Sequence, residues 1–484
     1  MTNNNNVRNA IKLSLIMQII SKLIAFISVI MVARLLTPDE LGVFAIVSAF
    51  TIIFVDLRFF GTGNYLIKER EVTEGKRRAV LGVSLVISVA LGVILLIVAP
   101  LLARYFNYAD ITPLFQIMSI SFFVAPFFLV PHSMMMKEYN FKYLLIINTV
   151  SNLITLIMTV LLINLGFSYF SLAISMNITI FCNLFLTFLL VPQYMIFKPT
   201  LKESREIINF GGFNSLSIIF NRLAFVAPDI IIGKLGTAKD VAIYSRGMGF
   251  LDFLAQVLTM GFQPVALPYL SNSIHANENV NQAYLRATNL LGSICWPIMC
   301  VATISAYPLI MLLFGEQWKE AVPLVFFLGV WMLFKMIHIL SPSLFMAANK
   351  YKLLFYKALT IFILTALAIV ISYSDGLLAI AKAMAIVGII DFLITTVFLK
   401  VYFNLHIKTS VKSILPNIIL TALCGGLTYG ISNIFDFYSN EPVISLLLIA
   451  LVNIPIWIVM TKLLKLEIYI EIKRAMFALI PTSK

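Results

Sequence analysis

The sequence predicts an all-α polytopic membrane protein. Of its 484 residues, 61% are hydrophobic and 12% are charged, and the mean hydropathy is +0.98. Soluble domains have an apolar share near one half and a charged share of about a quarter, so this composition excludes that class. Apolar stretches long enough to cross a ~30 Å hydrocarbon core as helices recur along the chain. They are too long and too uniformly apolar for the strands of a β-barrel.

Fourteen of these stretches are expected to span the membrane. They lie at 10–35, 41–67, 79–103, 112–136, 143–164, 168–191, 209–234, 241–267, 284–310, 321–347, 353–373, 377–400, 413–435 and 443–464. The first stretch is long, contains Lys22 and lacks an A-x-A cleavage site. We therefore expect it to remain as a helix and not to be removed as a signal peptide.

Basic residues are distributed unevenly between the loops. If the N-terminus is cytoplasmic, 24 of the 35 Lys and Arg residues fall on the cytoplasmic side and five fall outside. The positive-inside rule therefore predicts that both termini lie in the cytoplasm. The basic residues are scattered over eight segments, so the net charge of +13 reports topology, and nucleic-acid binding is not expected.

A faint internal repeat divides the chain. Residues 22–50 align without a gap with residues 222–250. The aligned polar pairs include Lys22 with Arg222, Thr37 with Thr237, and Glu40 with Asp240. Each repeat unit holds six helices, an even number, so both copies enter the membrane in the same direction. The axis that relates them is therefore expected to lie along the membrane normal. The expected parts are two six-helix lobes, at 1–208 and 209–408, which face each other across a central cavity. Two additional helices with a cytoplasmic tail follow at 409–484. Chance similarity between apolar helices is the alternative.

Ten charged residues lie within the predicted spans, at least five residues from either end. The basic ones are Lys22, Arg58, Arg222, Arg246, Lys335 and Lys382, and the acidic ones are Asp56, Asp229, Asp252 and Asp391. At the bilayer centre each would cost roughly 2.5 to 3.5 kcal/mol, so most are expected to face a cavity or to pair with one another. For Arg246 and Lys382, which lie near helix ends, snorkelling to the interface is the alternative.

Polar side chains follow one face of three predicted helices. They are Ser14, Gln18, Ser21 and Ser28 beside Lys22; Asn214, Ser217 and Asn221 beside Arg222; and Asp252, Gln256, Thr259 and Gln263. Steps of three, four or seven residues keep each set on one helical face. Because the repeat relates these helices, we predict one hydrated lumen, with hydrogen bonding between helices as the alternative.

The sign of the intramembrane charges indicates a substrate class. Six basic residues against four acidic ones suit a diphosphate, which Arg and Lys bind through charge-assisted hydrogen bonds. An exporter of cationic drugs would be expected to carry an acidic excess. The four aspartates can take up H⁺ or Na⁺ and couple an ion gradient to transport, or can pair with a nearby base. For His338, three residues after Lys335, a packing role with satisfied hydrogen bonds is favoured.

Three stretches resemble signatures of a known family. They are ARLLTPDELGVFAIVSAF at 33–50, FQPVALPYLSN at 262–272 and LIMLLFGEQWKEAV at 309–322. Over nearly its full length the chain resembles Wzx-type polysaccharide flippases, and among them the colanic-acid exporters, within the multidrug/oligosaccharidyl-lipid/polysaccharide exporter superfamily. The resemblance implies an inner-membrane protein that moves undecaprenyl-diphosphate-linked oligosaccharides to the periplasmic face by alternating access. It also implies a role in O-antigen, capsule or exopolysaccharide assembly, with a polysaccharide polymerase and a chain-length regulator as partners.

Other functions fit the same architecture. A lipid II flippase and a multidrug or metabolite exporter belong to the same superfamily. A membrane glycosyltransferase or polymerase is disfavoured, because the short loops carry no acidic pair with metal-ligand spacing and no P-loop or GxSxG motif occurs. The four cysteines lie inside spans without a CxxC or His/Cys cluster. We therefore expect no catalytic residue, no metal site, and no cofactor apart from a coupling ion.

Overall fold

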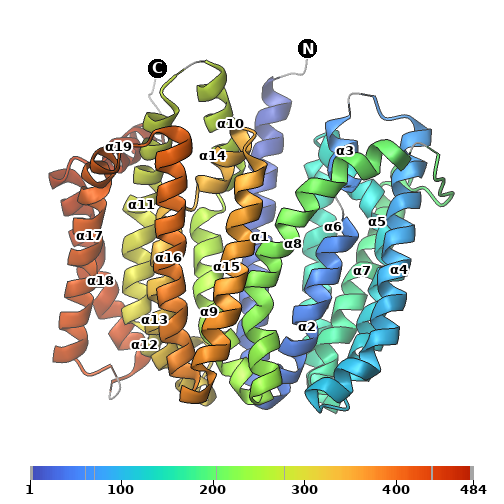
Figure 1. Ribbon diagram of the computed structural model, residues 1–484, viewed down its shortest axis with the longest axis horizontal. Helices are drawn as coiled ribbons and strands as arrows, with labels where there is room; N and C mark the ends of the chain where they lie inside the picture. The colour runs from blue at the N-terminus through green and yellow to red at the C-terminus, as the bar shows by residue number, and fades with distance from the viewer. Residues whose placement is uncertain are drawn as a thin grey trace. The chain divides into compact units, whose positions relative to one another are not determined.

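The computed structural model describes residues 4–59, 62–69, 71–202, 204–276, 278–437 and 440–479. Within these ranges the regular secondary structure is entirely helical (Figure 1). The predicted all-α membrane fold is confirmed, and the protein is a multi-pass membrane protein. The chain forms two compact units, Met1–Ala242 and Ile243–Lys484.

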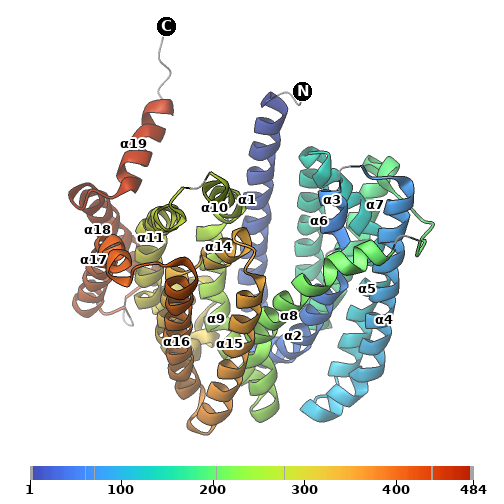
Figure 2. The ribbon, with the colours of Figure 1, turned by 45° about the horizontal axis from the view of Figure 1, so that its top comes forward.

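The first unit is a bundle of long helices joined by short connections. Its described elements are α1 (Asn4–Leu35), α2 (Pro38–Phe59), α3 (Thr62–Lys68), α4 (Glu74–Phe106), α5 (Ile111–Lys137), α6 (Phe141–Leu162), η1 (Ile163–Phe167), α7 (Phe170–Leu190), η2 (Pro192–Tyr194) and α8 (Ser204–Leu235). Helix α5 packs between α4 and α7, α1 lies along α6, and α8 packs against α2 and α4. Figure 2 shows the α4, α5 and α7 neighbours from a second direction.

A cluster of buried hydrophobic residues lies where α3, α4 and α5 meet in the first unit. Leu66, Leu81 and Met135 are fully buried there, one from each of these helices. Lipid tails are as apolar as these side chains, so close van der Waals packing holds the helices together, with little contribution from the hydrophobic effect.

The second unit begins within α9 and continues to the C-terminus. Its described elements are α9 (Ala238–Thr259), α10 (Gln263–His275), α11 (Val280–Ile304), α12 (Ala306–Leu313), η3 (Glu316–Ala321), α13 (Val322–Ile337), α14 (Ser341–Ala347), α15 (Tyr351–Ser372), η4 (Tyr373–Asp375), α16 (Leu377–Phe403), α17 (Ile407–Ile434), α18 (Pro442–Leu463) and α19 (Glu467–Leu479). Helix α16 packs against α13 and α15, and α17 packs against α11 and α18. Trp457 of α18 donates a hydrogen bond from Nε1 to the Ser293 carbonyl oxygen of α11, at 2.8 Å.

Each of the fourteen predicted spans overlaps one or more of the described helices. In the described part of the chain, twelve helical segments are long and apolar enough to cross a membrane. The predicted spans 209–234 and 241–267, which correspond to α8 and to α9 with α10, are not among the twelve. Helix α9 carries both Arg246 and Asp252, which lower its hydropathy. The number fourteen therefore stays a prediction, as does the division at 208 and 408.

The starts of α2 and α9 are built alike. The Thr37 backbone N–H donates to Glu40 Oε2 at 2.8 Å, and the Glu40 backbone N–H donates to Thr37 Oγ1 at 3.4 Å. The corresponding distances between Thr237 and Asp240 are 2.9 Å and 3.2 Å. Both pairs are reciprocal capping boxes, which satisfy free N–H groups at a helix start. The aligned positions of the internal repeat thus form the same local structure.

Candidate functional site

An ion pair joins α2 and α8 inside the first unit. Arg222 Nε donates to Asp56 Oδ2 at 2.5 Å, and the guanidinium carbon lies 6.0 Å from the centre of the Phe225 ring. The side chains of Arg222 and Asp56 are 37% and 19% exposed. Pairing reduces the cost of keeping either charge within the membrane. One predicted cationic residue and one predicted acidic residue are therefore direct partners.

Arg58 lies on a different face of α2 from Asp56, as their two-residue spacing predicts. Its side chain is buried, its Nη1 donates to the Ser121 carbonyl oxygen at 3.5 Å, and its guanidinium carbon lies 5.3 Å from the centre of the Phe122 ring. Arg58 lines a cavity of about 230 Å³ between α2, α5 and α7. Polar side chains share this cavity with it: Thr51, Ser121, Asn177 and Thr179. Arg58 thus lines a cavity within the first unit, and its role as a substrate-binding cation stays a prediction.

The other predicted polar positions of the first unit lie along α1 and α8. Gln18 and Lys22 are half-buried on α1, Asp229 is half-buried on α8, and Asn221 is exposed on α8. The side chains of Ser14, Asn214, Ser217 and Gln263, the last on α10, lie outside the described residues.

The second unit contains a cluster of two basic and two acidic side chains. Lys357 Nζ of α15 and Asp391 Oδ1 of α16 form an ion pair at 3.0 Å, and both side chains are largely buried. The charges of Asp252, Asp391 and Lys357 all act on Lys335 of α13. Lys335 Nζ also lies 4.7 Å from the centre of the Trp331 ring. The cluster, formed by Asp252, Lys335, Lys357 and Asp391, is formally neutral.

The two aspartates of this cluster have different partners. Asp391 is bound by an ammonium group, whereas Asp252 Oδ2 accepts a hydrogen bond from the neutral amide of Gln256 at 2.6 Å. Lys357 lies near the start of the predicted span 353–373 and is one of the 24 basic residues that the charge pattern places on the cytoplasmic side. Its position in the second turn of α15 is the signal that places it inside the helix.

The remaining charged positions contact aromatic rings. The Arg246 guanidinium carbon lies 4.9 Å from the centre of Phe314 and 4.6 Å from that of Trp318. Lys382 is exposed, and its Nζ lies 5.5 Å from the centre of Phe327. Such contacts stabilise a cation by about 0.5 to 2 kcal/mol, more when it is desolvated.

His338 has the packing role that the sequence favoured. Its Nδ1 lies 3.0 Å from the Tyr284 hydroxyl, its Nε2 lies 2.9 Å from Thr396 Oγ1, and its ring stacks on Phe392. Both ring nitrogens are therefore engaged within the second unit.

Comparisons with known proteins identify the family. Residues 31–323 match the family model described as "Polysaccharide biosynthesis protein". The teichuronic acid biosynthesis protein TuaB of Bacillus subtilis (strain 168) is 23% identical over 408 residues, which are 81% of this chain and 82% of that protein. The succinoglycan biosynthesis transport protein ExoT of Rhizobium meliloti (strain 1021) is 25% identical over 306 residues, 62% of this chain and 61% of that protein.

The fold is similar to that of a solved transporter. The lipid II flippase MurJ in its inward closed conformation matches with a TM-score of 0.73 at 16% identity, over 94% of this chain and 98% of that chain. At this identity the likeness concerns the fold alone. The family model matches more than half of the sequence, so the chain belongs to the family of polysaccharide biosynthesis proteins.

Proposed function

We propose that the protein is a flippase of the bacterial inner membrane, with both termini in the cytoplasm. Its substrate is an undecaprenyl-diphosphate-linked oligosaccharide, which it moves to the periplasmic leaflet for surface polysaccharide assembly. The observation that carries this proposal is the location of Arg58. A buried cation that lines a cavity between membrane-spanning helices, in a chain of this family, suits an anionic substrate that crosses the membrane.

The cavity at Arg58 supports a diphosphate as the bound group. Its volume of about 230 Å³ is below the roughly 300 to 1,000 Å³ of pockets that hold whole small molecules. It would hold the phosphate groups and leave the glycan outside. A guanidinium offers several fixed donors to phosphate oxygens, whereas the hydroxyl groups of Thr51 and Thr179 already donate to carbonyl oxygens of their own helices.

The Arg222–Asp56 ion pair supports a role in alternating access. A diphosphate would compete with Asp56 for Arg222, since both are oxygen anions that accept charge-assisted hydrogen bonds. Substrate binding would then separate α8 from α2 and favour another access state, because a ligand shifts an equilibrium by its differential affinity for the two states. Lys22, matched to Arg222 in the repeat, would supply a second cationic contact.

Asp252 is the preferred position for a coupling H⁺ or Na⁺. Asp391 is already neutralised by Lys357, whereas Asp252 is hydrogen-bonded to an uncharged amide. A proton or sodium ion at Asp252 would change the charge next to Lys335 and thereby the relative stability of two arrangements of the cluster.

A deletion strain tests the proposal directly. Loss of one surface polysaccharide, with its lipid-linked precursor accumulating in the cytoplasmic leaflet, is the expected phenotype. Accumulation of unpolymerised glycan in the periplasmic leaflet would instead indicate a polymerase and would contradict the proposal. The second candidate is a lipid II flippase, because the fold is similar to that of MurJ. Proteoliposomes that contain either fluorescent lipid-linked oligosaccharide or lipid II test which of the two substrates is translocated.

A further inference from the structure

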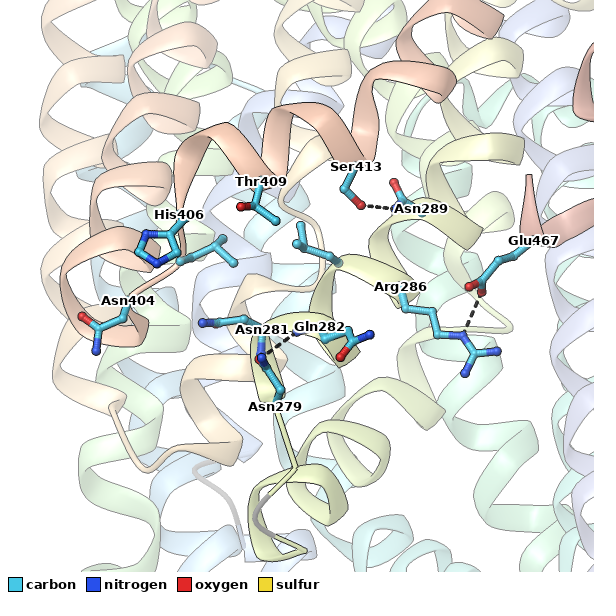
Figure 3. Close-up of a pocket in the computed structure, with 12 residues that line it drawn as sticks. Asn279, Asn281, Gln282, Arg286, Asn289, Asn404, His406, Thr409, Ser413 and Glu467 are labelled. Atoms are coloured by element: carbon cyan, nitrogen blue, oxygen red, sulfur yellow. Dashed lines mark hydrogen bonds and ion pairs between the residues drawn. The ribbon is translucent and has the colours of Figure 1, made fainter. Parts of the chain in front are cut away.

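A cavity of about 460 Å³, lined mainly by polar residues, lies in the second unit and shares no residue with the charged cluster (Figure 3). It is formed by the start of α11, the turn between α16 and α17, the first turns of α17 and the start of α19. The positive-inside pattern predicts that this end of the helices faces the cytoplasm.

Hydrogen bonds fix the frame of the cavity. Asn281 Nδ2 donates to the Phe403 carbonyl oxygen at 2.7 Å and ties α11 to the end of α16. Asn289 Nδ2 donates to Ser413 Oγ at 2.6 Å and ties α11 to α17. Asn279 Oδ1 accepts from two backbone N–H groups of α11, so that helix start is already capped and does not bind an anion.

Four side chains of the lining have their polar groups available. Gln282, Asn404, His406 and Thr409 are exposed, and within the described part of the chain their side chains form no hydrogen bond. Figure 3 shows them distributed around the space between α11 and α17. Each amide or hydroxyl both donates and accepts, as does neutral imidazole. A ligand with several hydroxyl groups matches this set, because each hydroxyl also donates and accepts.

The charge of the lining favours an uncharged ligand. Its two charged residues, Arg286 and Glu467, form an ion pair with Nε and Oε2 2.8 Å apart, so the lining is formally neutral. A phosphate would meet the Glu467 carboxylate, and a cation would meet Arg286. The volume lies within the range of small-molecule sites.

We propose that this cavity binds uncharged sugar units of the lipid-linked glycan before transport. The inference rests on the proposed function and adds a recognition site for the glycan, separate from the site for the diphosphate. Since Gln282 and Thr409 project from different helices, a sugar bound between them is held by α11 and α17 together.

A double variant, Gln282→Leu with Thr409→Val, tests the site. It removes two hydrogen-bonding groups at nearly constant volume from exposed positions, so the fold is expected to persist. The matched control is Gln193→Leu with Thr360→Val, at exposed positions outside this cavity. The probe is the soluble glycan released by mild acid from the lipid-linked precursor, and saturation-transfer NMR on purified protein measures its binding.

We expect the glycan to bind wild type and control alike, and the Kd of the double variant to rise about tenfold, the combined effect of two lost hydrogen bonds. Inorganic pyrophosphate should not displace it. No binding to wild type, equal binding to the double variant, or displacement by pyrophosphate would overturn the inference. A separate measurement of translocation of the lipid-linked substrate, with wild-type protein in proteoliposomes, tests the proposed flippase function independently of the cavity. If wild type translocates the substrate but the cavity binds no glycan, only the cavity assignment fails.

Discussion

Gly42 of α2 lies directly against the backbone of Ala238, the first residue of α9. A Cβ added to Gly42 would lie 1.7 Å from the Ala238 carbonyl oxygen, a distance that no side chain tolerates. Both residues belong to the first unit, and each lies at the start of a helix that begins with a capping box. The two repeat-related turns therefore close on each other, on the side that the charge pattern assigns to the periplasm.

The first prediction is that Gly42→Ala slows transport. The added methyl group must displace the turn at Ala238, and misfits of this kind cost about 1 to 3 kcal/mol. Translocation of lipid-linked oligosaccharide by proteoliposomes should fall about tenfold or more at equal protein content. The control is Gly249→Ala in α9, where the added Cβ meets open space. Wild-type rates in the Gly42 variant would show that this contact has no role in transport.

The second prediction concerns the charges at Lys22 and Arg222. Lys22→Ala and Arg222→Ala should abolish polysaccharide export at normal membrane levels, because each removes a cation proposed to hold the diphosphate. Lys22→Arg and Arg222→Lys should retain part of the export, since the charge persists although the donor geometry differs. Complementation of a deletion strain measures export, and Lys382→Ala, at an exposed lysine, is the control. Full export by the alanine variants would remove both residues from the site.

The third prediction isolates Arg58. Arg58→Ala should weaken binding of the lipid-linked substrate about tenfold or more in the absence of any ion gradient, because hydrogen bonds to a charged group contribute about 1.5 to 3 kcal/mol. Arg58→Lys should recover part of the affinity. Binding is measured by fluorescence of a labelled lipid-linked oligosaccharide. If Arg58→Ala and wild type bind equally, the cavity between α2, α5 and α7 is not the diphosphate site.

The fourth prediction fixes the topology. Reporter fusions after residues 75, 200 and 408 should report the cytoplasm, and fusions after 38, 107 and 238 should report the periplasm, as the uneven distribution of basic residues requires. Alkaline phosphatase and green fluorescent protein give opposite signals on the two sides and serve as mutual controls. A periplasmic signal at residue 75 would invert the whole arrangement.

The helices could be predicted from the sequence, whereas the partners of their charges could not. An apolar run of about 20 residues predicts a span on its own, because backbone hydrogen bonds within the membrane are satisfied inside the helix. The spacing of Asp56 and Arg58 also predicted correctly that they face different neighbours. That Asp56 meets Arg222, 166 residues away, depends on how α2 and α8 pack, which periodicity within one helix does not report. The pairing of Lys357 with Asp391 was missed for the same reason.

The last prediction separates the two aspartates of the charged cluster. Asp252→Asn should leave substrate binding largely intact but remove the response of transport to an imposed H⁺ or Na⁺ gradient, because the charge that would take up the cation is lost. Asp391→Asn should act differently. It leaves the largely buried Lys357 without its carboxylate, so the thermal unfolding temperature in detergent should fall, an effect that Asp252→Asn should not produce.

A double variant, Asp391→Asn with Lys357→Met, is the control for this last test. It removes both charges at once and should recover part of the lost thermal stability, since replacing a buried ion pair by uncharged groups is often neutral. The measurements are substrate binding without a gradient, translocation with each gradient imposed, and thermal unfolding. Wild-type dependence on the gradient in Asp252→Asn, with transport intact, would exclude Asp252 as the coupling position.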